Sequence, residues 1–306
     1  MVINNNKKNY AFIFPGQGSQ KIGMLNDYLA DDLTKELIDE ANEALGYDLL
    51  NLCQHGPIEK LTLTENAQPA ILAVSYIAYR LFSKLYSDIK PSYLAGHSLG
   101  EYTAFLAGGS FSFGDALRIV KLRGKYMQES VPNGVGAMGA LLGVDKDKAL
   151  TLCQQAAEGE VLLPANYNCP GQIVVSGHKG ALMRLKKIAK LIILPVSVPF
   201  HSPLIDDVED KMRKVLDNYE IKDSKIGVIN NIKNQLIFKR EDVKKSLLKQ
   251  IVAPVLWQSG IEHMINNGVV DFIEFGHSKV LVNMLKKTNS AVRGTTFCGL
   301  NIKYDF

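Results

Sequence analysis

The sequence has few cysteines, no long apolar run and no concentration of charge of one sign. Its 306 residues include four cysteines, which lie far apart and lack the close spacing of metal ligands. We expect reduced thiols that pack as small apolar side chains at Cys53, Cys153, Cys169 and Cys298. No apolar run approaches the roughly 20 residues that span a bilayer, and residues 1–10 lack the apolar stretch of a secretory signal. These absences predict a cytoplasmic protein with no membrane partner.

The basic residues are spread along the chain rather than clustered, although the net charge is +4 and the isoelectric point is near 8.7. Without a basic patch or stripe, there is no reason to expect a nucleic-acid partner. A hydrophobic content of 46% is ordinary for a globular protein, and the length fits one large domain or two modest ones.

Short apolar runs alternate with helical patterns over most of the chain. The runs predict strands, and the 3.6-residue periodicity predicts helices. Strands are expected at residues 10–14, 93–95, 226–229 and 270–274, and helices at residues 32–45 and 68–86. Alternating strands and helices favour a parallel α/β sheet.

The middle of the chain follows a different order. Strand, helix, strand, strand, helix and strand are expected at residues 137–144, 147–157, 161–168, 172–176, 179–189 and 191–198. This βαββαβ order is that of a ferredoxin-like unit. We therefore predict an inserted small domain over residues 131–199 and a discontinuous large domain over residues 1–130 and 200–306. A ligand cleft is expected between them.

Gly96-His97-Ser98-Leu99-Gly100 carries the clearest chemical signal. A strand, Gly-x-Ser-x-Gly and a helix in that order form the nucleophile elbow of α/β-hydrolase-like folds. We expect the glycines to allow the tight turn that exposes the Ser98 hydroxyl. The backbone N–H of Leu99 is one candidate oxyanion donor, and a second is expected from the glycine-rich loop at residues 15–18, which could also be a plain strand-to-helix turn.

A serine hydroxyl needs a general base. His201 is the first candidate among six histidines because it lies where the chain leaves the predicted small domain, at the mouth of the cleft. His277, at the end of a predicted strand, is the alternative, and His97 is expected to point away from the serine. A hydrogen-bonded histidine without a catalytic role would fit the local sequence of His201 equally well.

Arg123 lies in the middle of an apolar helical stripe at residues 115–127, while the other basic residues there lie on the opposite face. A guanidinium that faces inward must meet an anion, because burying an unpaired charge is costly. Its planar fork suits a carboxylate. The anion is either a protein carboxylate in a structural ion pair or the free carboxylate of an acyl substrate.

Several stretches together resemble the malonyl-CoA:acyl-carrier-protein transacylases, over residues 10–285. They are PGQGSQ at residues 15–20, GHSLGEY at 96–102, RGKYMQ at 123–128, NYNCPGQ at 166–172, PVSVPFH at 195–201 and NN at 230–231. The family includes the enzyme of fatty-acid synthesis and free-standing acyltransferases that serve polyketide synthases.

The resemblance implies a ping-pong reaction in which malonyl passes from malonyl-CoA to a serine and then to the phosphopantetheine thiol of an acyl carrier protein. It implies no metal or redox cofactor, and we expect a monomer. The implied roles are nucleophile for Ser98, base and then acid for His201, oxyanion N–H donors for Gln17 and Leu99, malonyl-carboxylate ligand for Arg123, and a backbone carbonyl that orients the histidine for Gln250. Phe200 resembles the malonyl-selective members, because its ring would crowd an α-methyl group.

One departure and two other functions stay open. His277-Ser278 replaces the usual Pro-Gly of the resembled family, which leaves the shape of that loop undetermined. A related hydrolase that releases stalled acyl groups would share the serine and histidine but needs no carboxylate ligand, and a docking module with an inactive site would need none of these residues. Candidate lysines for docking an acidic carrier are Lys186, Lys187, Lys190, Lys286 and Lys287.

Overall fold

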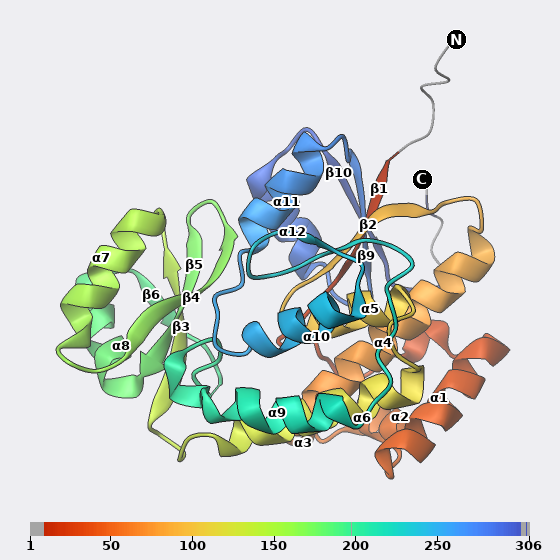
Figure 1. Ribbon diagram of the computed structural model, residues 1–306, viewed down its shortest axis with the longest axis horizontal. Coiled ribbons are helices and arrows are strands. Elements are labelled where there is room, and N and C mark those ends of the chain that lie inside the picture. The colour runs from red at the N-terminus through yellow and green to blue at the C-terminus, as the bar shows by residue number, and fades with distance from the viewer. Residues whose placement is uncertain (1–8, 197, 301–303, 305–306) are drawn as a thin grey trace.

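The computed structural model describes residues 9–196, 198–300 and 304, which are arranged around two sheets (Figure 1). The larger sheet has six strands in the order β10-β9-β1-β2-β7-β8, and the smaller has four in the order β4-β5-β3-β6. In Figure 1 the smaller sheet, in green, lies to one side of the larger sheet together with its two helices.

The larger sheet is parallel except for its last strand. Its strands are β1 (Tyr10–Phe14), β2 (Pro91–Gly96), β7 (Val228–Ile229), β8 (Leu236–Ile237), β9 (Asp271–Phe275) and β10 (Arg293–Phe297). Only β8 runs antiparallel, against β7. The predicted parallel α/β fold is therefore confirmed. The strand expected at residues 226–229 is shorter than predicted, and β8 and β10 were not predicted.

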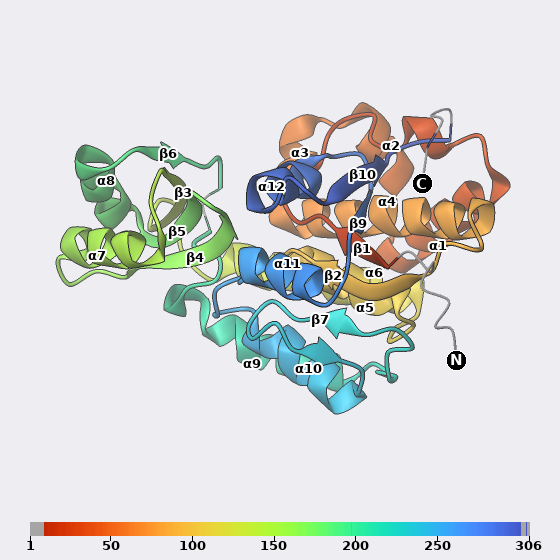
Figure 2. The same ribbon diagram turned by 90° about the horizontal axis from the view of Figure 1, so that it is seen from above.

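Successive residues of β1 face two different cores, as the two-residue period of a strand requires. Phe12 and Phe14 pack in the core that includes residues of α4, α5 and α6, whereas Ala11 and Ile13 pack against α11 and α12. Figure 2, which looks along the strands, shows α11 and α12 on one side of the sheet and α4 and α5 on the other. Both faces of β1 are buried, which explains why this strand is a continuous apolar run.

Ten helices of the described residues surround this sheet, of which the sequence predicted only four: those at residues 32–45 and 68–86, the one after the elbow and the one over residues 115–127. The ten helices are α1 (Asp32–Leu45), α2 (Leu49–His55), α3 (Ile58–Thr62), α4 (Thr64–Leu85), α5 (Leu99–Ala107), α6 (Phe113–Glu129), α9 (Asp207–Asp217), α10 (Arg240–Lys249), α11 (Trp257–Asn266) and α12 (Val280–Thr288), with 3-10 turns at Asn26–Tyr28 and Pro203–Ile205.

The smaller sheet is antiparallel and has its helices on one face. Its elements are β3 (Gly136–Leu142), α7 (Lys146–Ala157), β4 (Leu162–Cys169), β5 (Gln172–His178), α8 (Lys179–Ile188) and β6 (Leu191–Ile193). The βαββαβ order of elements agrees with the prediction. The last strand stops well before the predicted residue 198, since Pro195 has no N–H for a ladder; residue 197 of that prediction lies outside the described residues. The domain boundaries at residues 131 and 199 stay a prediction.

The other face of the smaller sheet looks toward the larger one. Met138, Ala140 and Val174 on this face belong to the core of the large sheet rather than to the core under α7 and α8. The backbone of Val255 joins the two parts, because it accepts from Tyr167 N at 2.9 Å and donates to Ala165 O at 2.8 Å. The smaller sheet is thereby held over the edge of the larger one.

The cysteines and the helices can be compared with two expectations from the sequence, reduced buried thiols and no membrane-spanning segment. Cys53, Cys153 and Cys169 are buried as expected, whereas Cys298 is partly exposed. All four are free thiols. Within the part of the chain that the structure describes, no helix is both long and apolar enough to cross a membrane. The secretory-signal expectation concerns residues 1–10, of which 1–8 lie outside the described residues.

Candidate active site

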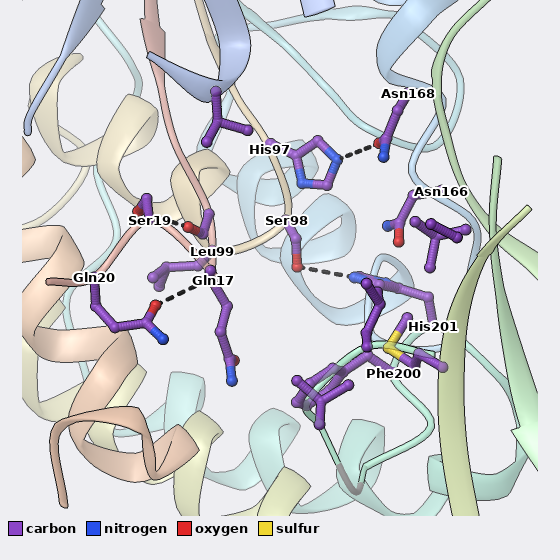
Figure 3. Close-up of a pocket in the computed structure, with 18 of the residues that line it drawn as sticks. Gln17, Ser19, Gln20, His97, Ser98, Leu99, Asn166, Asn168, Phe200 and His201 are labelled. Carbon is purple, nitrogen blue, oxygen red and sulfur yellow. Dashed lines mark hydrogen bonds between the residues drawn. The ribbon is translucent and has the colours of Figure 1, made fainter. Parts of the chain in front are cut away.

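A cavity of about 310 Å³ lies where β1 and β2 end, under the helix-free face of the smaller sheet (Figure 3). Pairing of Phe14 with Gly96 brings the loops that follow these two strands side by side. The cavity is lined by the loop at residues 16–20, by His97, Ser98 and Leu99, by Gln68, Arg123, Phe200 and His201, by Met138, Ala140, Asn166, Asn168, Gln172 and Val174 of the smaller sheet, by Leu194, Pro195 and Val196, and by Thr62, Val280, Leu281 and Met284.

The nucleophile elbow places its strain on the serine. Ser98 has φ 51° and ψ −104°, a conformation that costs energy in a residue with a side chain. Gly96 and Gly100 were expected to allow the tight turn, but the structure shows that they allow close approach of backbone segments. A Cβ on Gly96 would lie 1.9 Å from the carbonyl of Gly100, and a Cβ on Gly100 would lie 2.0 Å from Phe14 O. They therefore allow close packing of α5 on the strands.

Asn231, which follows β7, holds the elbow in this conformation. Its Oδ1 accepts from Ser98 N at 2.7 Å, and its Nδ2 donates to Gly96 O at 2.7 Å. Both backbone groups would otherwise be left without partners in a buried site, which is costly. In the sequence, Asn231 is marked only by the family resemblance, which implies no role for it.

His201 lies within hydrogen-bond distance of Ser98, with Nε2 2.8 Å from Oγ (Figure 3). Its Nδ1 is 2.7 Å from the backbone oxygen of Gln250. A carbonyl only accepts, so Nδ1 carries the proton and Nε2 is free to accept one from the serine. His277 is not among the residues that line the cavity. His97 turns away, with its Nε2 2.9 Å from Asn168 Oδ1.

The position of Gln250 explains why a carbonyl takes the place of an acid. Gln250 is the C-cap of α10, where carbonyl groups have no partner within the helix. The partial negative charge at a helix C-terminus also favours an imidazolium nearby. The structure therefore places at Nδ1 a fixed acceptor that can orient the ring and stabilise its protonated form.

Burial lowers the pKa of His201 to about 3, with the Arg123 guanidinium as the second cause. The imidazole is therefore neutral at physiological pH and can act as a base. A carboxylate bound to Arg123 would offset the second cause and raise the basicity of His201 when substrate is present.

Two residues that line the cavity together with Ser98 have backbone N–H groups without an acceptor in the described part of the chain. Leu99 is the first residue of α5, and Gln17 lies in the loop after β1; both line the cavity (Figure 3). In residues 9–196 and 198–300, neither amide donates a hydrogen bond to another group of the chain. Free donors at a helix N-terminus and an adjacent loop are suited to a developing oxyanion.

Arg123 is buried, with 1% of its surface exposed, and it faces the serine. Its Nη1 donates to Gln68 Oε1 at 2.8 Å, while Nη2 donates to Gln250 Oε1 at 2.9 Å and to Ser98 Oγ at 3.2 Å. The guanidinium also lies 5.2 Å from the ring centre of Tyr102. These partners are all neutral.

No carboxylate of the described residues lies within 4.0 Å of Arg123, and its Nε has no partner there. The structural ion pair considered from the sequence is therefore not observed. A buried cation whose direct hydrogen-bond partners are all neutral, and which the Glu101 carboxyl group reaches only through Gln250, favours binding of an anion in the cavity.

Sequence reasoning missed two polar residues around Arg123. Gln68 was recognised only as the first residue of a predicted helix, and Glu101 only as part of a motif. Both are buried, with 1% and 0% exposure. A polar residue inside an apolar helical run was the available signal at both positions, as it was for Arg123. Phe200, by contrast, lines the cavity beside His201 as the family resemblance implies.

Comparison with known proteins agrees with this geometry. Residues 11–301 match the acyl transferase domain family. A malonyl CoA-acyl carrier protein transacylase of Haemophilus influenzae is 40% identical over 287 residues, 92% of each chain. The solved transacylase of that name from Coxiella burnetii superposes with a TM-score of 0.93 at 37% identity, over 95% of this chain and 94% of that one. A solved complex of a type II polyketide synthase acyl-carrier protein with its malonyl-transacylase has a TM-score of 0.93 at 36% identity, over 96% and 97%.

Proposed function

The chain belongs to the acyl transferase domain family, and on that premise we propose that it transfers malonyl from malonyl-CoA to the phosphopantetheine thiol of an acyl carrier protein. The observation that carries the proposal is the position of Arg123. Its buried guanidinium has only neutral partners and lies 3.2 Å from Ser98 Oγ. An acyl group attached to Ser98 would place a terminal carboxylate beside this cation.

The first half-reaction acylates the serine. Ser98 Oγ attacks the thioester carbonyl of malonyl-CoA while His201 Nε2 takes the hydroxyl proton. The N–H groups of Gln17 and Leu99 stabilise the oxyanion of the tetrahedral intermediate. The C–S bond then breaks, CoA leaves as a thiol with the proton from His201, and a malonyl ester remains on Ser98.

The second half-reaction reverses the direction of proton transfer. His201 takes the proton of the carrier thiol, the sulfur attacks the Ser98 ester, and the oxyanion binds the same two N–H groups. Cleavage of the ester bond returns the serine oxygen, which recovers the proton from His201. Both halves balance with thiols, one serine and one histidine, so the proposal includes no metal or redox cofactor.

Arg123 supports transfer over the hydrolase alternative. A hydrolase that releases acyl groups has no need of a buried cation at the serine, and a docking module has no need of the serine–histidine contact. The relatives named as malonyl transacylases support the same choice. The cytoplasmic location and the monomeric state stay predictions.

Intact-mass measurement after addition of malonyl-CoA tests the acyl-enzyme. The wild-type protein should gain the mass of one malonyl group and lose it on addition of a holo carrier protein, which should gain the same mass. Ser98→Ala should not be labelled. Ser19→Ala is the matched control, because Ser19 also lines the cavity but is not at the elbow. A malonyl adduct on Ser98→Ala would overturn the assignment, and release of free malonate in place of transfer would favour the hydrolase.

A further inference from the structure

Glu101 is a fully buried carboxyl group close to the site, and the reaction described above does not use it. It lies in the first turn of α5, three residues after Ser98, with 0% of its surface exposed. It forms no ion pair with a basic residue of the described chain. A buried carboxyl group is costly unless its oxygens accept hydrogen bonds, so its contacts indicate its function.

Each oxygen of Glu101 accepts from a different element. Oε1 accepts from Ser246 Oγ at 2.6 Å, whereas Oε2 accepts from Asn231 N at 3.2 Å and from Gln250 Nε2 at 2.9 Å. These donors belong to α10, to its C-cap and to the loop after β7. Glu101 therefore joins the residue that holds the elbow to the residue whose carbonyl faces His201.

The contact with Gln250 fixes which way its side-chain amide faces. Because Nε2 donates to Glu101, Oε1 must face the opposite side, where it accepts from Arg123 Nη2 at 2.9 Å. A reversed amide would place its NH₂ against the guanidinium, donor against donor. Ser98 O also accepts from Nε2, at a longer 3.3 Å, so the Glu101 carboxyl group at 2.9 Å is the stronger of the two acceptors that favour the observed orientation.

We propose that Glu101 is a positioning residue that orients the Gln250 amide toward Arg123 and so holds the guanidinium where the malonyl carboxylate binds. The inference rests on the proposed role of Arg123 in malonyl transfer. Gln250 then acts twice: its backbone oxygen orients His201, and its side-chain oxygen orients the arginine. Selection of malonyl over acetyl consequently depends on a residue that does not contact the substrate.

Two variants of Glu101 separate this role from others. Glu101→Gln keeps an oxygen for Gln250 Nε2, and its NH₂ can donate to Ser246 Oγ. Glu101→Ala removes the acceptor. We expect Glu101→Ala to lower the malonyl-to-acetyl ratio of kcat/KM about tenfold or more, chiefly by raising KM for malonyl-CoA, because a hydrogen bond to a charged group is weakened. Glu101→Gln should restore most of the ratio.

Ser246→Ala is the matched control, because it removes the contact to the other oxygen of Glu101 and leaves Gln250 in place; its ratio should equal that of the wild type. An unchanged ratio in Glu101→Ala would overturn the proposal. An equal loss in both Glu101 variants would also overturn it, because the charge and not the orientation of Gln250 would then matter. A fall of both activities in parallel with the melting temperature would show a structural role only.

Arg123→Ala in the same assay distinguishes the inference from the proposed function. If Arg123→Ala does not change the ratio, the carboxylate contact itself is wrong; if only Glu101→Ala leaves it unchanged, the inference alone fails. Should Glu101→Ala not fold, Gln250→Leu tests the same contact, since it removes the amide but keeps the backbone carbonyl. Its malonyl-to-acetyl ratio should fall as well, and an unchanged ratio would overturn the proposal.

Discussion

Ser98 and His201 both have positive φ angles, 51° and 57°. Such strain persists only where surrounding contacts fix the chain, and it concentrates at functional sites. At the serine the contact is to the backbone, from the Asn231 side chain, and at the histidine the Gln250 carbonyl fixes the imidazole ring. Ser98 and Arg123 could be predicted, because a motif and an apolar stripe mark them. Asn231 could not, because it contacts a residue 133 positions away and no local pattern encodes that contact.

Removal of the Arg123 charge should change substrate choice. Arg123→Ala is expected to lower malonyl transfer on the order of 10²-fold, because a charge-assisted carboxylate contact is lost. Acetyl transfer should fall only a few-fold, since acetyl has no carboxylate. The measurement is kcat/KM for both acyl-CoAs together with a melting curve.

The control for this prediction is Arg118→Ala, on the exposed side of the same helix, where Arg118 pairs with Asp115. It should leave both activities unchanged. A malonyl-to-acetyl ratio in Arg123→Ala equal to that of the wild type would contradict the carboxylate contact.

The low pKa of His201 has a consequence for the pH profile. Because burial and Arg123 lower this pKa to about 3, the base stays neutral from pH 7 down to pH 5, where an ordinary histidine becomes protonated. The kcat/KM for acylation of Ser98 by malonyl-CoA, which reports the free enzyme, should therefore not show an acid limb at pH 6–6.5. Glu101 titrates near this range, since burial raises its pKa to about 7; the profile of Glu101→Gln removes that contribution. An acid limb near 6.5 in both proteins would refute the prediction.

At the scale of elements, helix termini supply much of the site. The N-terminus of α5 presents Leu99 N–H, and the C-terminus of α10 presents the Gln250 carbonyl. The elbow motif predicted α5, whereas no pattern in the sequence predicted α10. Hydrophobic periodicity did not predict β8, which is too short to show a period, or β10, whose Arg-Gly-Thr-Thr-Phe sequence is largely polar. Both strands depend on pairing with neighbours that the sequence alone does not identify.

The loop between β9 and α12 carries His277-Ser278 in place of the usual Pro-Gly, and Ser278 forms a new hydrogen bond there. Ser278 Oγ donates to Glu274 Oε1 at 2.8 Å, and Val282 N donates to Oε2 at 2.9 Å. Gly276 takes φ 127°, which a residue with a side chain rarely adopts. Ser278 thus adds a hydrogen bond to the buried carboxyl group of Glu274, which also accepts from the first turn of α12. Residues of α12 form one wall of the cavity.

Glu274 should make stability depend on pH. Burial raises its pKa from 4.5 to about 7, so the folded state holds this proton more tightly than the unfolded state does. The resulting stability is present at low pH and is lost as pH rises from 4.5 through about 7. Glu274→Gln removes this titration. The stability of the variant minus that of the wild type should therefore be about 2 kcal/mol greater at pH 8 than at pH 5. Urea unfolding at the two pH values measures it. Equal differences at both values would exclude the effect.

At the scale of the whole molecule, the two sheets form one site together. The larger sheet and its helices carry the serine, the histidine and the arginine, and the smaller sheet closes the cavity with Met138, Ala140 and Asn166. The sequence order predicted two units and a cleft between them. It could not predict how the smaller sheet is held, because the backbone bridge between Asn166 and Val255 joins segments that are far apart in the chain.

Because one cavity serves both half-reactions, CoA and the carrier protein must approach the same opening. Lys286 and Lys287 are exposed in the last turn of α12, whose first turns line the cavity. Lys186 and Lys187 are exposed on α8, which covers the other face of the smaller sheet. If the carrier presents an acidic surface, the α12 pair is the better placed to bind it while the thiol reaches Ser98.

Transfer to the carrier should therefore be more sensitive to salt than acylation by malonyl-CoA, because charges at the edge of an interface act mainly on association and are screened at high ionic strength. Lys286→Glu/Lys287→Glu should slow transfer to the carrier about tenfold or more at low salt, by a lower association rate, and change acylation much less. Lys186→Glu/Lys187→Glu is the matched control on the far helix and should have a smaller effect. Intact-mass measurements on samples quenched at successive times give the rate of each half-reaction at low and at high salt. Equal salt dependence of the two half-reactions, or a larger effect of the α8 pair, would show that the carrier does not dock beside α12.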